Sequence, residues 1–211
     1  MLDTVSIEQG SDLWKQVRLG HVTASAVADV MSRGKERESE SRAKYRMKLV
    51  AERLTGESQD TYSNSYMDWG KEQEQFAAIA YEVEKDVLVE KTGFWKHPTI
   101  QWVGVSPDRL VGEDGLIEIK CPATTTHLGY LLDGKVPTKY VKQIQCQLWV
   151  TGRKWCDFVS FDPRLTKRQR LFIVRCERDE KLIKQMEVEV VKFLEEVESL
   201  IINLEQNHGS Q

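Results

Sequence analysis

Charged residues gather in two short segments near the middle of the chain, Ser106-Pro107-Asp108 and Glu118-Ile119-Lys120, with nine residues between them. Two carboxylates and one ammonium group are costly to bury as ordinary core. Carboxylate oxygens are preferred ligands of hard cations such as Mg²⁺, and a two-carboxylate site with open positions suits a metal that also holds phosphate oxygens. The two segments therefore indicate a metal site, and the lysine would add charge near an attacking water.

A β-hairpin would bring these side chains together. With Glu113-Asp114-Gly115 as a three-residue loop and Gly115 left-handed, Asp108 lies opposite Lys120. Side chains two positions apart on a strand share a face, so Asp108, Glu118 and Lys120 are expected to project together. The isoleucines at positions 117 and 119 then point into the core.

An ordinary hairpin with a solvated charged face explains the same triplet equally well, and Glu74 favours the metal site. Glu74 shares a helical stripe with small or apolar residues, namely Gly70, Ala77, Ala78 and Tyr81. A carboxylate in such surroundings is unfavourable unless it is paired or metal-bound. Glu74 is therefore a candidate third acidic ligand.

Helical and extended patterns alternate around this hairpin and predict an α/β domain. Helices are expected at 11–20, 23–34, 40–55, 67–85, 138–150 and 177–204, and strands at 87–91, 94–97, 101–106, 108–121, 155–161 and 170–176. The helix at 138–150 has the length of a parallel crossover between two of these strands. Residues 76–81 are apolar nearly all round, which predicts that their helix is buried on more than one face.

The composition is that of one globular domain. The 211 residues include 30 basic and 33 acidic side chains, which excludes a uniformly basic DNA-coating protein and a disordered polyampholyte. No run of 18 apolar residues and no signal sequence is found, which predicts a cytosolic protein without a membrane span. The four cysteines have no C-x-x-C spacing, which argues against a zinc site and against a disulfide framework.

Charge is distributed unevenly along the chain. Residues 33–53 contain eight Lys/Arg and four Glu, residues 164–170 are also basic, and residues 177–211 contain nine acids and four bases. Solvated faces are the ordinary explanation for such segments. A polyanion would be met at the two basic segments if they lie near the catalytic residues.

Longer motifs follow one another in order and go beyond the bare Asp/Glu/Lys pattern. They comprise Glu8-Gln9-Gly10, Arg18-Leu19-Gly20, Thr23-Ala24-Ser25, Trp69-Gly70-Lys71, Ser106-Pro107-Asp108, Glu118-Ile119-Lys120-Cys121-Pro122, Gln143-Ile144-Gln145, Trp149-Val150-Thr151, Phe161-Asp162-Pro163-Arg164 and Glu177-Arg178-Asp179-Glu180-Lys181. In these motifs the chain resembles the PD-(D/E)XK nucleases, and within them the phage lambda exonuclease (YqaJ-like viral recombinase) group.

The resemblance implies an α/β, restriction-endonuclease-like core with a central mixed β-sheet flanked by helices. It implies a single nuclease domain over 1–211, with N-terminal helices at 1–60, a catalytic core at 66–176 and a C-terminal helix at 177–205.

The implied activity is that of a Mg²⁺-dependent 5′→3′ exonuclease. It would degrade one strand of linear double-stranded DNA from a 5′-phosphorylated end and leave a 3′ single-stranded tail for phage-type homologous recombination. Two Mg²⁺ ions per site are implied, with Mn²⁺ as a substitute. The implied setting is the cytoplasm of a bacterial host, with a single-strand annealing protein as partner.

Close relatives form a homotrimeric ring, which the resemblance extends to this chain. A ring would retain DNA despite the net charge of −3. The expected arrangement has the basic segments 33–53 and 164–170 facing the channel and the acidic C-terminal helix facing outward.

The resemblance also assigns the residues of hydrolysis. Asp108, Glu118 and Glu74 correspond to metal ligands, together with the backbone carbonyl of Ile119. Lys120 and Gln143 correspond to the catalytic residues that position the attacking water.

Four further residues correspond to those that hold the DNA end. Arg18, Ser25 and Ser106 fall where the family binds the terminal 5′-phosphate, a role that suits a guanidinium and two hydroxyl groups. Met67 falls at the apolar wedge that separates the terminal base pair, where leucine is usual.

Two alternatives remain open at this point. One is an endonuclease or junction-cutting enzyme of the same fold, which would cut circular DNA internally. The other is a non-catalytic module that binds DNA ends, which would release no nucleotide when Mg²⁺ is added.

Overall fold

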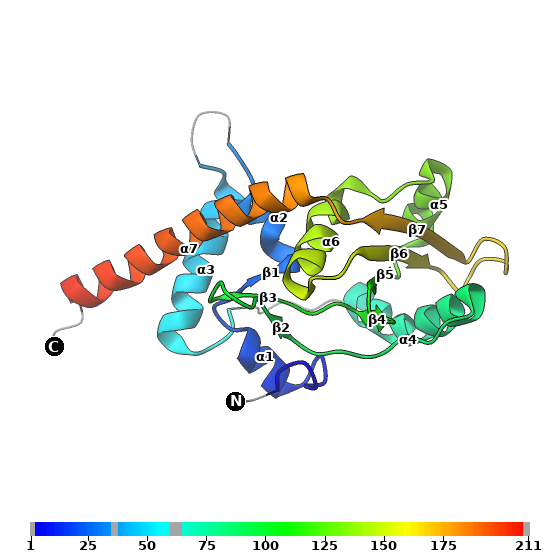
Figure 1. Ribbon diagram of the computed structural model, residues 1–211, viewed down its shortest axis with the longest axis horizontal. Coiled ribbons are helices and arrows are strands. Elements are labelled where there is room, and N and C mark those ends of the chain that lie inside the picture. Colours follow the sequence, from blue (N-terminus) through cyan, green and yellow to red (C-terminus); the bar gives the residue numbers. More distant parts are fainter. Residues whose placement is uncertain (1–2, 35–37, 60–64, 209–211) are drawn as a thin grey trace.

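The computed structural model describes residues 3–34, 38–59 and 65–208 (Figure 1). Its helices are α1 (Asp12–Arg18), the 3-10 helix η1 (Ala24–Ala26), α2 (Val27–Val30), α3 (Glu40–Thr55), α4 (Ser65–Lys85), α5 (Thr124–Asp133), α6 (Thr138–Thr151) and α7 (Glu180–His208). Its strands are β1 (Val22–Thr23), β2 (Trp95–Lys96), β3 (Val103–Val105), β4 (Arg109–Val111), β5 (Gly115–Lys120), β6 (Trp155–Phe161) and β7 (Leu171–Glu177). In the described part of the chain, no helix has the length and apolar character needed to cross a bilayer.

The strands form two sheets rather than one. The smaller sheet has the order β1-β3-β2, and the larger has the order β4-β5-β6-β7. Strands β5 and β6 are parallel, and their neighbours β4 and β7 are antiparallel to them. The predicted α/β class, the mixed pairing and the parallel crossover are confirmed. The crossover contains α5 in addition to the predicted helix α6, because Gly134 at φ +63° ends α5 before α6 begins.

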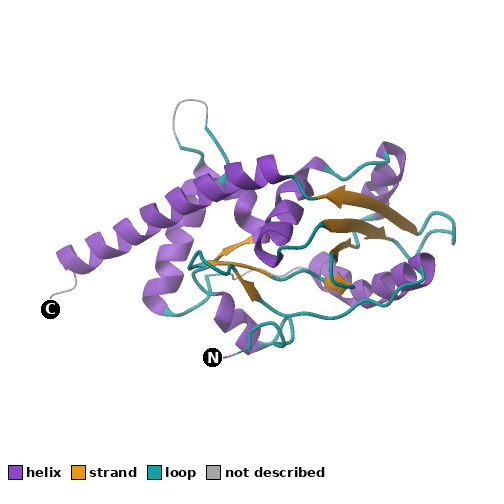
Figure 2. Cartoon of the chain, viewed as in Figure 1, coloured by secondary structure: helices purple, strands orange, loops and turns teal. Residues whose placement is uncertain are grey.

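Helices cover both faces of the larger sheet (Figure 2). Odd-numbered residues of β5, Ile117 and Ile119, pack with Tyr81 and its neighbours on α4. Leu116, on the other face, packs with Ile144 of α6. Both faces of β5 are therefore interior, which is typical of a strand with a parallel neighbour.

Helix α6 lies between the two sheets and is buried from 144 to 150. Ile144 and Leu148 face the larger sheet. Cys146, Trp149 and Val150 belong to a second core with the smaller sheet, α2, α3 and α7. This one helix therefore joins the two halves of the molecule.

Helix α4 corrects one prediction. Ala77 and Tyr81 are buried, but Phe76, Ile79 and Val83 are 50%, 55% and 79% exposed. Sequence periodicity identifies apolar positions but does not show which other elements pack against them. Here the larger sheet packs against one side of α4 only. The expectation that this helix is buried on more than one face is wrong within the described chain, and an apolar strip remains on its outer side.

Helix α7 packs on α3 and extends past the rest of the molecule (Figure 1). Arg42 and Arg46 of α3 both pair with Glu196 of α7 at 2.7 Å. Arg33 pairs with Glu189 at 2.9 Å. The acidic helix therefore neutralises these arginines, while the expected orientation of segment 33–53 toward a DNA channel stays a prediction.

The central hairpin forms with a register two residues from the predicted one. Arg109 lies opposite Ile117 and Val111 opposite Gly115, so the loop is 112–114. Gly112, not Gly115, has the left-handed conformation, with φ +51°. A shift of two residues preserves the side-chain faces, so the predicted common face of residues 108, 118 and 120 survives.

Gly115 begins β5 directly beneath a tryptophan ring, and this contact gives a stability prediction. A Cβ added at Gly115 would lie 2.2 Å from Trp155 Cη2. We expect Gly115→Ala to lower the free energy of unfolding by about 1–3 kcal/mol, because overpacking forces the ring or the strand to move. Gly129→Ala, in α5 with nothing within 4 Å of the new methyl group, is the matched control and should be neutral or stabilising. Urea denaturation would show the difference, and equal midpoints for the two variants would contradict the packing argument.

Candidate active site

Glu118 is the buried centre of the site. It lies on β5, is 1% exposed, and forms an ion pair through Oε1 with Lys120. Gln143 Nε2 donates to the same oxygen at 2.5 Å, and Gln147 Nε2 donates to Oε2 at 2.6 Å. Both carboxylate oxygens are therefore satisfied, by one charge and by two amides that project from one face of α6 at i and i+4.

Asp108 lies beside Glu118, as the hairpin predicts. Its Oδ2 accepts a hydrogen bond from the backbone N–H of Ile119 at 2.6 Å. Burial, reinforced by the carboxylate of Glu118, raises the pKa of Asp108 well above its usual range, and Lys120 opposes this effect. A carboxyl group in this environment is stabilised as a carboxylate by any added cation.

Lys120 supplies the positive charge of the cluster. Burial disfavours its charged form, but the carboxylates of Glu118 and Asp108 outweigh burial and raise the pKa of Lys120 above its ordinary value. Its Nζ lies 5.3 Å from the ring centre of Tyr140 on α6. Lys120 is therefore an ammonium group fixed between a carboxylate and an aromatic face.

Glu74 reaches the site through a residue that the sequence analysis missed. Arg109 Nη1 donates to Glu74 Oε1 at 2.8 Å and to the backbone oxygen of Asp108 at 2.5 Å. The Glu74 carboxylate also contributes to the raised pKa of Asp108. Arg109 directly follows Asp108 in the sequence, and this position beside a candidate ligand was the available signal. Gln147 was also missed, although it lies four residues after Gln143.

Trp14 connects two of the residues predicted to hold the 5′-phosphate. The Arg18 guanidinium lies 3.8 Å from the centre of the Trp14 ring, and Trp14 Nε1 donates to Ser106 Oγ at 3.0 Å. An indole N–H only donates, so the Ser106 oxygen accepts here and its hydroxyl hydrogen is directed elsewhere. Ser25 lies on η1, is exposed, and has its Oγ 3.4 Å from Thr23 Oγ1.

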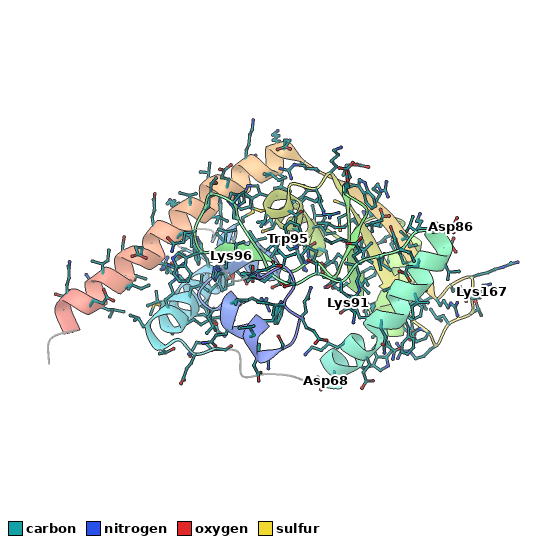
Figure 3. All side chains as sticks on the ribbon, turned by 60° about the horizontal axis from the view of Figure 1, so that its bottom comes forward. Asp68, Asp86, Lys91, Trp95, Lys96 and Lys167 are labelled. Atoms are coloured by element: carbon teal, nitrogen blue, oxygen red, sulfur yellow. The ribbon has the colours of Figure 1, made fainter. Side chains whose placement is uncertain are left out.

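A cavity of about 820 Å³ opens between α1, α4 and the segment at 5–10. Glu74 and Arg109, next to the carboxylate cluster, and Trp14, next to Arg18, line it. Three lysines complete its wall: Lys15, Lys71 and Lys91. Figure 3 labels Lys91 between α1 and α4. Such a lining suits a polyanion.

The start of α4 lies close to the end of β5. A Cβ at Gly70 would lie 3.8 Å from the Cys121 backbone oxygen. Arg164, held by Asp162 at 2.7 Å, lies over the ring of Trp69 at 4.6 Å. The basic segment 164–170 thus begins beside the site. Met67 belongs to the first part of α4, but its side chain lies outside the described residues.

The donor set suits a divalent cation. Among the described residues, no group of three His, Cys, Asp or Glu side chains is arranged to hold a metal; Glu74 is paired with Arg109, and Glu118 with Lys120. Asp108, Glu118 and the Ile119 carbonyl nevertheless form an all-oxygen set with an excess of acid, which is the chemistry that Mg²⁺ prefers. The Ile119 carbonyl as a ligand stays a prediction.

Comparison with protein families decides the relationship. Residues 13–154 match the model of the YqaJ-like viral recombinase domain, a stretch that includes every candidate site residue. The chain belongs to this family. The resemblance noted in the sequence is thereby confirmed.

Solved structures agree with membership of the YqaJ-like family. LHK-Exo, an alkaline exonuclease from Laribacter hongkongensis, was solved alone and with dAMP; in the dAMP complex it is 45% identical and covers 94% of this chain and 98% of its own, with a TM-score of 0.89. A phage-related exonuclease from Haemophilus somnus shares the fold at 16% identity, with a TM-score of 0.68 and coverage of 87% and 96%. Protein R354 of Acanthamoeba polyphaga mimivirus is 28% identical over 72% of this chain, which spans 29% of that protein's length.

The two amides on Glu118 lead to a prediction for this YqaJ-family site. Gln147→Leu leaves one buried carboxylate oxygen without its donor, which should cost about 1–3 kcal/mol of stability. It should also weaken Mn²⁺ binding by about 10–100-fold, since partners of metal ligands orient them. Gln145→Leu is the matched control, because Gln145 is equally buried on α6 but donates to the Glu177 backbone oxygen, away from Glu118.

Calorimetric titration with Mn²⁺ and urea denaturation would separate the two effects. Both variants should lose stability, and only Gln147→Leu should lose metal affinity. Unchanged Mn²⁺ binding in Gln147→Leu would show that Glu118 needs no support from this amide.

Proposed function

We propose that this chain is a divalent-metal-dependent 5′→3′ exonuclease that degrades one strand of double-stranded DNA from a 5′-phosphorylated end and leaves a 3′ single-stranded tail. The observation that supports it most is the continuity between two groups of residues. The Asp108–Glu118–Lys120 cluster is joined through Ser106 and Trp14 to Arg18, so a site for hydrolysis adjoins a site for a terminal phosphate. The 45% identity to an alkaline exonuclease over nearly the whole chain agrees with this assignment.

Asp108, Glu118, Glu74 and the Ile119 carbonyl would hold the metal, as two Mg²⁺ ions with Mn²⁺ as a substitute. When bound, the metal stabilises the negative charge on the entering and leaving oxygens. Lys120 holds its ammonium group beside the carboxylates of Glu118 and Asp108, where it stabilises charge on the phosphate and orients the attacking water. Gln143 donates Nε2 to Glu118 and has in Oε1 an acceptor for that water.

Arg18 and Ser106 would set the direction of digestion. The Arg18 guanidinium lies over the Trp14 ring, and the Ser106 hydroxyl accepts from the indole N–H, so both would present donors to a terminal phosphate, with Ser25 as the third. The complex of LHK-Exo with dAMP contains a nucleoside monophosphate, the kind of product that one cleavage at a phosphorylated end releases. Met67, with Trp69 and Arg164 nearby in the fold, would separate the two strands at the end.

The function is tested by nucleotide release from linear duplexes with 5′-phosphate or 5′-hydroxyl ends and from closed circles, with Mg²⁺ and with EDTA. We expect mononucleotides from phosphorylated linear DNA with Mg²⁺, none with EDTA, and none from Lys120→Ala that remains folded. Internal cuts in circles would assign an endonuclease, and DNA binding without release would assign an end-binding module.

Arg18 provides a specific prediction within this function. Arg18→Ala should lower kcat/KM on 5′-phosphorylated ends by the equivalent of about 1.5–3 kcal/mol, because a charge-assisted contact is lost. Digestion of 5′-hydroxyl ends should change much less. An equal loss on both substrates, measured in single-turnover reactions, would mean that Arg18 only packs on Trp14.

We also propose a homotrimeric ring that works in the cytoplasm of a bacterial host and passes its product to an annealing protein. A chain of net charge −3, whose arginines on α3 are paired with α7, has little general attraction for DNA and needs another means of retention. The outer strip of α4 borders a hollow of about 1020 Å³ that is lined by Phe76, Ile79, Val83 and apolar residues of β7 and rimmed by basic residues. A neighbouring copy in a ring would cover such a surface.

The strip gives the test of assembly. Phe76→Glu should convert the trimer into monomers in light scattering and shorten the tracts digested before dissociation, while digestion of short duplexes continues. Leu132→Glu, at an 88% exposed leucine of α5, is the matched control and should remain trimeric. A wild-type protein that is monomeric at micromolar concentration would exclude the ring.

A further inference from the structure

Helix α3 contacts the backbone of the segment between Arg18 and Ser25, beside a contact of 2.9 Å from His21 Nδ1 to the Leu19 backbone oxygen and the pairing of 22–23 with β3. At its start, Gly20 N–H donates to Glu52 Oε2 at 3.0 Å, and Gly20 C=O accepts from Arg53 Nε at 3.0 Å. Two consecutive residues of α3 thus bind both polar groups of one glycine. The turn after α1 is thereby fixed from outside.

Any side chain at position 20 would be strained and would crowd Arg53. Gly20 has φ +69°, and a Cβ there would lie 2.5 Å from Arg53 Cγ. The guanidinium of Arg53 in turn lies 4.3 Å from the ring centre of Trp102. The backbone at position 20 is therefore enclosed between Glu52 and an arginine that is itself held by an aromatic ring.

A third residue of α3, Tyr45, contacts the same segment closer to Ser25. Tyr45 Oη accepts from Thr23 N–H at 3.2 Å and donates to the His21 backbone oxygen at 3.2 Å. Its ring stacks on Phe193 of α7 at 5.7 Å, so the hydroxyl has a fixed position. Thr23 is the residue whose hydroxyl contacts Ser25.

Two of the α3 residues that make these contacts, Glu52 and Arg53, are charged and buried. Glu52 and the Arg53 side chain are each 6% exposed; Lys48 lies 3.7 Å from Glu52, and Glu198 lies 3.6 Å from Arg53. Buried ion pairs are a poor source of stability compared with apolar packing, but they define geometry. Because both charged residues bind one glycine, we infer that they fix the backbone geometry of the turn between Arg18 and Ser25.

We propose that Tyr45, Glu52 and Arg53 are positioning residues that set the spacing between Arg18 and Ser25 and thereby the preference for a 5′-phosphate. The proposal gives none of the three a contact with the substrate. The inference rests on the proposed function, because Arg18 and Ser25 are there the ligands of the terminal phosphate. It predicts that loosening the turn affects recognition of the phosphate and not the chemistry at Glu118.

Tyr45→Phe is the sharpest test, because it removes one hydroxyl and leaves the ring in the core. Binding of duplexes with 5′-phosphate and with 5′-hydroxyl ends would be measured in EDTA, and KM and kcat would be measured with Mg²⁺. The preference for the phosphorylated end should fall by about two- to tenfold, the equivalent of one lost hydrogen bond. The change should appear in KM, with kcat and all values for 5′-hydroxyl ends unchanged.

Tyr81→Phe is the matched control, since Tyr81 is also buried but donates its hydroxyl to Asp157, away from the turn. It should keep the wild-type preference. Glu52→Ala should lose more of the preference than Tyr45→Phe, and Glu52→Gln, which retains an acceptor oxygen for Gly20 N–H, should restore it. If Glu52→Ala does not fold, Tyr45→Phe and Glu52→Gln still decide the question.

The outcomes separate the two levels of inference. A wild-type enzyme that does not distinguish 5′-phosphate from 5′-hydroxyl ends would contradict the proposed phosphate site. A wild-type preference that Tyr45→Phe retains in full, or an equal loss on both kinds of end, would overturn the positioning role.

Discussion

The active-site half of the molecule depends on the burial of one carboxylate. Glu118 lies inside the larger sheet, where an unpaired charge would be prohibitive, and it is tolerated because Lys120 and two amides of α6 satisfy it. That solution requires α6 to lie across the carboxyl end of β5. A parallel β5–β6 pair requires a crossover connection, and α6 is part of that connection. The topology of the sheet therefore places α6 next to Glu118.

In the proposed function, binding of the DNA end and hydrolysis belong to different parts of the chain. Arg18 and Ser25 come from the N-terminal helical region, whereas Asp108 and Glu118 come from the hairpin of the larger sheet. Trp14 and Ser106 form the junction between these parts. A site divided in this way allows the proposed phosphate recognition to change without disturbing the metal ligands.

The sequence predicted the hairpin cluster because alternation along a strand depends on parity and tolerates a register error of two residues. It predicted the wrong glycine for the turn, Gly115 instead of Gly112, since both are compatible with the loop chemistry. Arg109 and Gln147 were missed because their roles arise from contacts across elements, which no local pattern reports. The outer face of α4 was misjudged for the same reason, and the two-residue strand β1 is too short to carry a periodic signal.

The arginines that pair α3 with α7 also change how the protein responds to salt. Arg42 and Arg46 take part in internal ion pairs and are only 11% and 20% exposed, so they release no counterions when DNA binds. Dissolved ions screen the exposed lysines of the cavity more strongly than these shielded pairs. Raising the ionic strength should therefore weaken the proposed binding of DNA well before it loosens the contact between α3 and α7. The dependence of DNA affinity on salt concentration should reflect only those lysines and arginines that are not paired in that contact.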